Sequence, residues 1–221
     1  MKLLVRRIVS QPFAENTYVV WQEGAGDALV VDPGLEPELI LELLKRERLG
    51  VAAVLNTHGH ADHIAGNQAM KQAYPSAPLV IGELDAAMLT DPVLNLSAAF
   101  GEPMVSPAAD RTVKDGETIE YAGIVLEVRH IPGHSPGHVV YVGLGIVLGG
   151  DVLFQGSIGR YDFPGGSYAA LMHGIRTKLL TLPPETVVYP GHGGATTVGS
   201  EAEDNPFLEP TIQVVASAKN Q

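Results

Sequence analysis

The chain has 221 residues, 45% of them hydrophobic and 18% charged, which predicts one folded globular domain with a sizeable core. Its formal net charge of −11 at pH 7, without a cluster of Lys and Arg, argues against a nucleic-acid partner or a membrane surface. The absence of cysteine excludes disulfides and thiolate metal sites, and it leaves His and Asp as the available metal ligands.

The N-terminal stretch MKLLVRRIV predicts a strand at residues 2–9 and no targeting segment. Arg6 and Arg7 interrupt its apolar run before the run reaches the length of a signal peptide. No run of about eighteen apolar residues, as a membrane-spanning helix needs, occurs anywhere in the chain. We therefore expect a soluble, cytoplasmic protein.

Two more short strands are predicted at residues 16–22 and 28–31, and the second of them ends in Asp32-Pro33-Gly34. One interpretation of this ending is turn chemistry alone. The other is that the Asp32 carboxylate accepts a hydrogen bond from the far nitrogen of a metal-bound histidine and so fixes the tautomer of that ring. A ligand cluster after the next βα unit favours the second interpretation.

The next elements are predicted from apolar spacing. A helix is expected at residues 36–48, followed by a strand at 51–55. A second helix should run from 64 to 74 and stop before Pro75. The segment between this strand and this helix, THGHADH, holds three histidines and an aspartate.

This histidine segment predicts a metal site on a loop. His58 and His60 are two residues apart, so in an extended segment their rings point the same way and can converge on one cation. Asp62 and His63 lie on the following turn, where they could face a second cation. The alternative is a loop without metal, in which Asp62 caps the next helix. Three imidazoles and a carboxylate this close together favour the metal site.

A second group of strands follows an irregular connection at residues 90–110. This connection is marked by three prolines and little periodicity, and we expect it to form part of a substrate-pocket wall. A short strand and a short helix come before it, and most of the second strand group comes after it. The ranges are, in order, 79–81 and 83–89, then strands at 117–121, 124–131, 139–142, 146–148 and 186–189, with a helix from 168 to 180 between the last two. Two groups of strands, each mixed with helices, predict two packed sheets with helices outside.

This second half of the chain carries the remaining candidate ligands. In the turn IPGHSPGH, His134 could complete a three-histidine site with His58 and His60, whereas His138, where the next strand begins, is expected to have a structural, hydrogen-bonding role. Asp151 closes an apolar run, and a carboxylate can bridge two cations. His192 follows the last strand and is a further candidate.

Two histidines, His130 and His173, remain. Neither lies directly after a strand that carries other ligands, and we expect both to be packing or surface residues.

Taken in order, THGHADH, GHSPGH, Gly150-Asp151 and PGHG resemble the motifs of the metallo-β-lactamase superfamily. The resemblance spans residues 32–192. It implies a single α/β domain over residues 1–221, an αββα sandwich of two mixed sheets flanked by helices. It also implies a set of ligand roles: His58, His60 and His134 for one metal, Asp62, His63 and His192 for a second, and Asp151 as the bridge.

The finer resemblance is to the glyoxalase II-like, or hydroxyacylglutathione hydrolase-like, branch. It rests on GGDVLFQGSIGRYDFPGG at residues 149–166 and on TVGSE and NPF near the end of the chain. It implies a thioesterase acting on S-acyl thiols such as S-lactoylglutathione, with two divalent cations, Zn²⁺ first and Fe²⁺ or Mn²⁺ as alternatives. A hydroxide on these cations would attack the thioester carbonyl, with Asp151 as the bridge and Asp62 as general base in a one-metal form.

Substrate recognition and reaction class leave alternatives open. The larger glyoxalase II enzymes hold glutathione with a C-terminal helical extension, which we do not expect here, since Lys219 is the single cation after His192. Arg160 and Tyr161 are then the candidates for holding a substrate carboxylate, although Arg160 could instead pair with Asp162. The rival activities are a one-iron persulfide dioxygenase, whose Gly-Arg-x-Asp-Phe stretch resembles residues 159–163, and a lactonase or other metallo-hydrolase. The sequence does not predict the oligomeric state.

Overall fold

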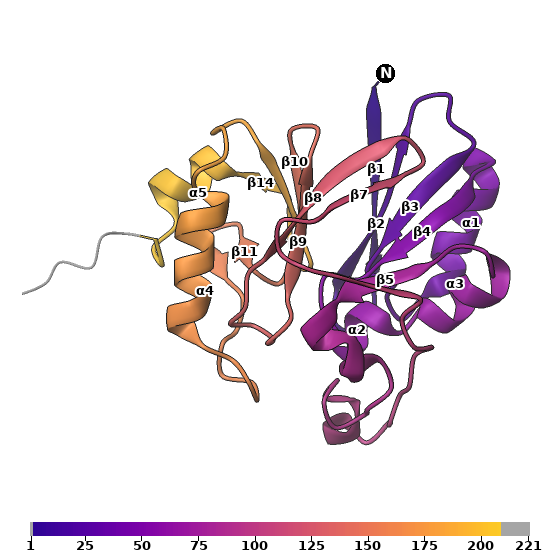
Figure 1. Ribbon diagram of the computed structural model, residues 1–221, viewed down its shortest axis with the longest axis horizontal. Coiled ribbons are helices and arrows are strands. Elements are labelled where there is room, and N and C mark those ends of the chain that lie inside the picture. The colour runs from indigo at the N-terminus through magenta and orange to yellow at the C-terminus, as the bar shows by residue number, and fades with distance from the viewer. Residues whose placement is uncertain (1, 209–221) are drawn as a thin grey trace, which may run out of the picture.

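The computed structural model describes residues 2–208, so Lys219 lies outside the described residues. Two six-stranded mixed sheets face each other in the middle of the molecule, with helices on both outer sides (Figure 1). This is the four-layer α/β arrangement that the sequence predicted. Within residues 2–208 no helix has both the length and the apolar composition needed to cross a membrane.

The first sheet is built from the N-terminal half of the chain. Its strands lie in sequence order, β1 to β6, with β1, β2 and β3 antiparallel and β3 to β6 parallel. The bounds are β1 Leu3–Ser10, β2 Glu15–Gln22, β3 Asp27–Val31, β4 Gly50–Leu55, β5 Leu79–Gly82 and β6 Arg111–Val113. Helices α1 (Pro37–Glu47) and α3 (Asn67–Ala73) cover its outer face (Figure 1).

The second sheet is built from the C-terminal half, in the order β14-β13-β10-β9-β8-β7. Its bounds are β7 Thr118–Tyr121, β8 Ile124–His130, β9 Val139–Gly143, β10 Ile146–Gly150, β13 Val187–Pro190 and β14 Thr196–Thr197. Helix α4 (Tyr168–Gly174), continued by the π-helical turn η3 (Ile175–Leu179), and helix α5 (Val198–Asp204) lie on its outer side. A small hairpin of β11 (Leu153–Phe154) and β12 (Ser157–Ile158) follows β10.

Three apolar layers hold these elements together. Val20, Leu29, Leu126 and Tyr141 belong to the layer between the two sheets. A second layer packs the first sheet against α1 and α3, and a third packs the second sheet against α4 and α5. Alternating side chains of central strands such as β3 and β9 therefore enter two different layers, as expected for strands covered on both faces.

The strand directions bring several strand ends to one edge of the sandwich. In the first sheet β3 runs parallel to β4, and in the second β10 runs parallel to β13, so each pair ends at the same edge. Backbone hydrogen bonds join the sheets there, from Val139 N to Thr57 O at 2.8 Å and from Asn16 N to Gly191 O at 2.7 Å. The loops that leave these ends are those with the predicted metal ligands.

Two expectations about local structure are corrected. The helix predicted at residues 64–74 is two helices, α2 (Ala61–Ile64) and α3, broken at Gly66. The Gly66 N–H donates to Pro33 O at 2.8 Å, and a Cβ at this position would lie 2.8 Å from Gly34 O, so the chain packs against the turn after β3 too closely for a continuous helix. The irregular connection at 90–110 contains one 3-10 turn, η2 (Ser97–Phe100), after the 3-10 helix η1 (Glu83–Leu89).

Candidate metal centre

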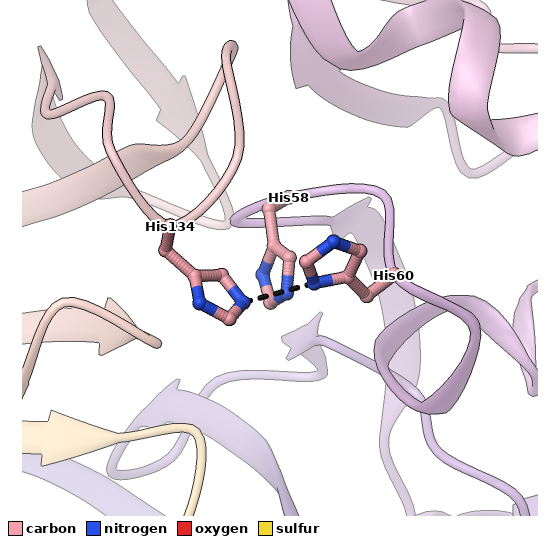
Figure 2. Close-up of side chains that lie close together, drawn as sticks. All are labelled: His58, His60 and His134. Carbon is pink, nitrogen blue, oxygen red and sulfur yellow. Dashed lines mark hydrogen bonds between the residues drawn. The ribbon is translucent and has the colours of Figure 1, made fainter. Parts of the chain in front are cut away.

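Three histidines converge between the two sheets. His58 and His60 lie on the loop after β4, and His134 lies on the loop between β8 and β9. Figure 2 shows the three rings turned toward one another, with His60 Nδ1 2.9 Å from His134 Nε2. One nitrogen of each ring lies within 4.8 Å of the corresponding nitrogens of the other two, and all three residues are buried. This is the geometry of a three-histidine cation site.

A second group of ligand atoms lies beside the first. Asp62, on α2, places Oδ2 3.7 Å from His63 Nε2 and 3.3 Å from His192 Nε2. The alternative in which Asp62 caps the helix is not what the structure shows, because His60 is at the cap position and no side chain caps the helix there. The group Asp62, His63 and His192 could therefore hold a second cation.

Asp151 lies between the two groups. It follows β10, and its Oδ1 is 3.5 Å from His63 Nε2, whereas its Oδ2 is 3.5 Å from His134 Nε2 and 3.6 Å from His192 Nε2. One carboxylate thus faces ligand nitrogens of both groups. This placement is what a bridging ligand requires.

The unpaired atoms in this centre show that the residues present fit a metal ion. His58 Nε2, His63 Nε2 and Asp151 Oδ1 are buried and have no hydrogen-bond partner within the described chain. Buried polar atoms without partners are costly, so such a cluster indicates that these atoms share a ligand. Divalent cations satisfy imidazole and carboxylate atoms together.

Neighbouring groups fix which nitrogen of each ring faces the centre. His134 Nδ1 donates to Arg160 O at 2.8 Å, which leaves Nε2 as its lone-pair nitrogen. His63 Nδ1 donates to Asp32 Oδ2 at 3.1 Å, which leaves His63 Nε2 for the second group. Asp32 also accepts from Thr57 N at 2.7 Å and from Thr57 Oγ1 at 2.6 Å. Although Asp32 lies close enough to His58 and His63 to be a ligand itself, these hydrogen bonds give it the orienting role.

His138 lies behind the centre and does not face it. Its Nε2 accepts a hydrogen bond from the backbone N–H of Asp151 at 3.0 Å, and its ring stacks on that of His58 with 4.8 Å between the centroids. His138 thus links the loop that follows β10 with the loop that follows β4. Of the other two histidines, His173 is exposed, and His130 Nε2 donates to Pro136 O at 2.8 Å, so neither joins the centre.

The two ligand groups differ in their electrostatics. Burial, followed by the neighbouring imidazoles, lowers the pKa of His58 well below its usual value and lowers the pKa of His60 to about 3. Burial alone would also lower the pKa of His63, but Asp62, Asp151 and Asp32 together raise it well above its usual value. The pKa of His192 is also raised, since its hydrogen bond with Asp62 and the charge of Asp151 outweigh burial. Without metal, His58 and His60 are therefore neutral, whereas the neighbouring carboxylates favour the protonated forms of His63 and His192.

Asp85, which the sequence did not single out, joins the two histidine loops. It lies on η1, is fully buried, and accepts hydrogen bonds from Gly59 N at 3.3 Å, Ser135 Oγ at 2.5 Å and Gly137 N at 2.6 Å. One carboxylate thus fixes the backbone between His58 and His60 relative to the loop that carries His134. A lone aspartate in a short amphipathic segment gives no sequence signal for such a role.

Glu15 is a second buried carboxyl group that the sequence did not indicate. Its Oε1 lies 4.0 Å from His63 Nδ1, and its Oε2 accepts from Ser10 Oγ at 3.0 Å. Burial raises the pKa of Glu15 well above its usual value. Glu15 therefore lies next to Asp32 behind the ligand His63.

A cavity of about 540 Å³ opens onto the centre. Five of the candidate ligands line it, namely His60, Asp62, His134, Asp151 and His192. The connection at 90–110 contributes Asn95, Leu96 and Phe100 to its wall. A cavity of this volume is typical of small-molecule sites.

The two candidate substrate-binding residues differ in their placement. Arg160 lines the cavity, but its guanidinium forms a two-point ion pair with Asp162, at 2.9 and 2.8 Å. Tyr161 is not among the residues that line the cavity; its ring packs edge-on against Tyr168, with 5.0 Å between the centroids.

Known proteins resemble this chain over most of its length. The family model of the metallo-beta-lactamase superfamily matches residues 10–192. The hydroxyacylglutathione hydrolase GloC of Haemophilus influenzae is 36% identical over 200 residues, which cover 89% of this chain and 93% of that protein.

Two solved structures share the fold and much of the sequence. The crystal structure of the BLEG-1 B3 metallo-beta-lactamase has a TM-score of 0.90 and 37% identity, and the match covers 94% of this chain and 100% of that one. The crystal structure of TTHA1623 in a di-iron-bound form has a TM-score of 0.82 and 38% identity, covering 92% and 100%. By its matched motifs, its two-sheet fold and these relatives, the chain belongs to the metallo-beta-lactamase superfamily.

Proposed function

We propose that this protein is a metal-dependent hydrolase that cleaves acyl thioesters, and that S-lactoylglutathione is the first substrate to test. The observation that carries the proposal is the position of Asp151 between two ligand groups at the base of a cavity. The similarity to GloC, a hydroxyacylglutathione hydrolase, supports the choice of substrate. We also propose zinc as the metal, although the di-iron form of TTHA1623 makes iron the first alternative.

When bound, two divalent cations would act as Lewis acids and lower the pKa of a water to near neutrality. The chain's own residues do the rest. Asp151 and the histidines would hold the cations in a fixed arrangement. Asp62 lines the cavity beside His192. Burial alone would raise the pKa of Asp62, but His63 and His192 lower it below its usual value, so Asp62 is a carboxylate at neutral pH; it could hold the second cation or, in a one-metal form, accept a proton from water.

A thioester suits this site because its leaving group needs little help. Thiol pKa values lie near about 8.5, so the departing thiolate is stable without a general acid. Apart from the candidate ligands, the described residues that line the cavity include one ionisable side chain, Arg160, and its pairing with Asp162 leaves it poorly placed to protonate a leaving group. An amide or an alkyl ester, whose leaving groups are far more basic, would be cleaved more slowly.

A one-iron oxygenase such as a persulfide dioxygenase is the second candidate, since residues 159–163 read Gly-Arg-Tyr-Asp-Phe. The structure favours the hydrolase over this candidate by one feature. Asp62, His63 and His192 come together beside the three-histidine group, and a one-metal enzyme would leave this second group without a cation.

The test is metal analysis of the purified protein together with hydrolysis of S-lactoylglutathione. We expect about two metal ions per chain and a hydrolysis rate that His58→Ala and Asp151→Ala each lower by at least about a thousandfold, since each removes an essential ligand. His173→Ala is the control, because this exposed histidine lies away from the centre. A chromogenic cephalosporin assayed in parallel separates thioesterase from lactamase activity.

One iron per chain, oxygen uptake with glutathione persulfide and no hydrolysis would replace this proposal with the dioxygenase. Full metal occupancy with no turnover of thioesters, esters or lactams would contradict catalysis altogether.

A further inference from the structure

The cavity is walled by aromatic side chains from four separate segments. Phe13 comes from the turn between β1 and β2, Phe100 from η2, Phe154 from β11 and Phe163 from the segment after β12. Leu96 and Ile158 add further apolar surface. The space next to the metal centre is thus mainly apolar.

This apolar surface is continuous with the ligand rings. Phe163 packs edge-on against His60 and His134, with centroids 5.2 and 5.7 Å apart, and Phe154 lies 6.3 Å from the ring of His192. Farther out, Phe13 and Phe100 pack against each other at 5.6 Å. A substrate whose reacting carbonyl lies at the centre must therefore extend along phenylalanine rings.

The cavity offers little to an anionic substrate arm. Arg160 is the single Lys or Arg among the described residues that line it. Its guanidinium is already paired with Asp162 and lies over the Phe163 ring at 4.2 Å. The two carboxylates of a glutathione unit would have to compete with Asp162 for this one cation.

The outer aromatic pair is exposed at a cost. Phe100 is 63% exposed and Phe13 42% exposed, and both face the cavity. Burying such a side chain is worth about 1.5–3 kcal/mol relative to leaving it in water. Two adjacent exposed phenylalanines beside a reactive centre are typical of a contact surface for an apolar ligand.

We infer that the preferred substrates are thioesters with an apolar acyl group, which lies between the Phe13–Phe100 pair and Phe163. This inference rests on the proposed thioesterase function and narrows it. The acyl group is assigned to the apolar wall because carrier thiols such as glutathione and coenzyme A are polar or charged, so the apolar part of such a thioester is its acyl chain. Hydrolysis adds water across the C–S bond and releases a carboxylic acid and a thiol.

The experiment compares S-acyl-N-acetylcysteamine thioesters with acetyl, butanoyl and hexanoyl chains, together with S-lactoylglutathione. Within the N-acetylcysteamine series the thiol is constant and uncharged, so only the acyl group changes. We expect kcat/KM to rise about two- to fourfold for each added methylene, as burial of one CH₂ allows. The hexanoyl thioester should then exceed S-lactoylglutathione.

Phe100→Ala should lower the ratio of hexanoyl to acetyl kcat/KM by at least about threefold, because it removes half of the outer aromatic pair. Leu144→Ala is the matched control, since this exposed apolar residue lies in the turn between β9 and β10 and does not line the cavity. Calorimetric titration with the thioethers S-hexyl- and S-ethyl-N-acetylcysteamine, which cannot be hydrolysed, gives a readout independent of activity. Wild type should bind the hexyl compound more tightly, and Phe100→Ala should reduce the difference.

The outcomes distinguish failure of the inferred acyl preference from failure of the proposed thioesterase function. Hydrolysis of S-lactoylglutathione together with a flat or falling acyl series overturns the inference and leaves the thioesterase intact. No hydrolysis of any thioester by the metal-loaded protein overturns the proposed function itself. A Phe100→Ala ratio equal to that of wild type shows that the acyl chain does not contact this wall.

Discussion

The metal centre and the cavity wall lie side by side, but they are held in different ways. In the centre, His58, His63 and His134 are buried, and hydrogen bonds orient the rings of His63 and His134 from behind. In the wall, Phe13 and Phe100 are exposed and pack against each other. The centre is fixed by its surroundings, whereas the wall is free to differ without disturbing the chemistry.

This difference indicates how one fold can serve several substrates. The ligands follow strand ends that the two sheets bring to one edge, so their positions depend on the whole sandwich. The wall is built from four separate segments outside the two large sheets, each of which can change alone. Changes behind the centre should therefore affect metal binding, and changes in the wall should affect substrate choice.

The largest effect on metal binding is expected when a group that orients a candidate ligand is removed. Asp32→Asn should lower the affinity for metal by about ten- to a hundredfold, because the amide can no longer accept hydrogen bonds from both Thr57 and His63. Asp27→Asn, at the exposed start of the same strand, is the control. Metal affinity is measured by competition with a chromophoric chelator, and equal affinities for Asp32→Asn and Asp27→Asn would show that the orienting role is wrong.

The pH dependence of metal binding should differ between the two candidate cation sites of the centre. His63 and His192 have raised pKa values and must lose protons before they bind a cation, so the affinity of the second cation should fall as the pH drops below those values. The fall should be about tenfold per pH unit for each proton displaced. His58 and His60 are already neutral and release no proton on binding, so the affinity of the first cation should depend less on pH than that of the second.

Stepwise titration at several pH values, with proton release measured by calorimetry in buffers of different ionisation enthalpy, provides the measurement. Equal pH slopes for the two cations would contradict the assigned difference between the groups.

The same difference explains what could be predicted from the sequence. The candidate ligands at strand ends lie in short, local motifs, so His58, His60, Asp62 and His63 could be selected as candidates from their spacing alone, and the strand order brings the later candidates close to them. The partnership of Asp85 with Gly59 and Gly137 is non-local and depends on the packing of η1 between two loops, which no spacing reveals. The break at Gly66 depends likewise on the turn after β3.

The role of Tyr161 could not be predicted for a related reason. Its position in a glycine-rich loop near Asp151 is clear from the sequence, but the packing of its ring against Tyr168 of α4 is a tertiary contact that no local motif indicates.

Asp85 offers a test of whether the centre needs its second layer of support. Asp85→Asn places an amide N–H₂ against backbone and hydroxyl donors, so it should lower the free energy of unfolding by about 1–3 kcal/mol. It should also weaken binding of the first cation several-fold, because the loops of His60 and His134 are no longer tied together. Glu83→Gln is the matched control, since it lies on the same 3-10 helix but is exposed and paired only with Lys114. Chemical denaturation and metal titration of the two variants measure these effects. Loss of stability with unchanged metal affinity would show that Asp85 stabilises the fold and does not support metal binding.

The smallest effect on activity is expected for substitution of Arg160, the single Lys or Arg among the described residues that line the cavity. Arg160→Ala removes a side chain that is exposed and already paired with Asp162, so metal content should not change and kcat/KM for S-lactoylglutathione should fall by less than about twofold. Asp162→Asn, which frees the guanidinium, is the informative partner: it should raise kcat/KM for the glutathione thioester and leave that for hexanoyl-N-acetylcysteamine unchanged. If Arg160→Ala instead raised KM tenfold for S-lactoylglutathione alone, the ion pair with Asp162 must open on binding, and the wall would select its substrate by charge and not by apolar contact.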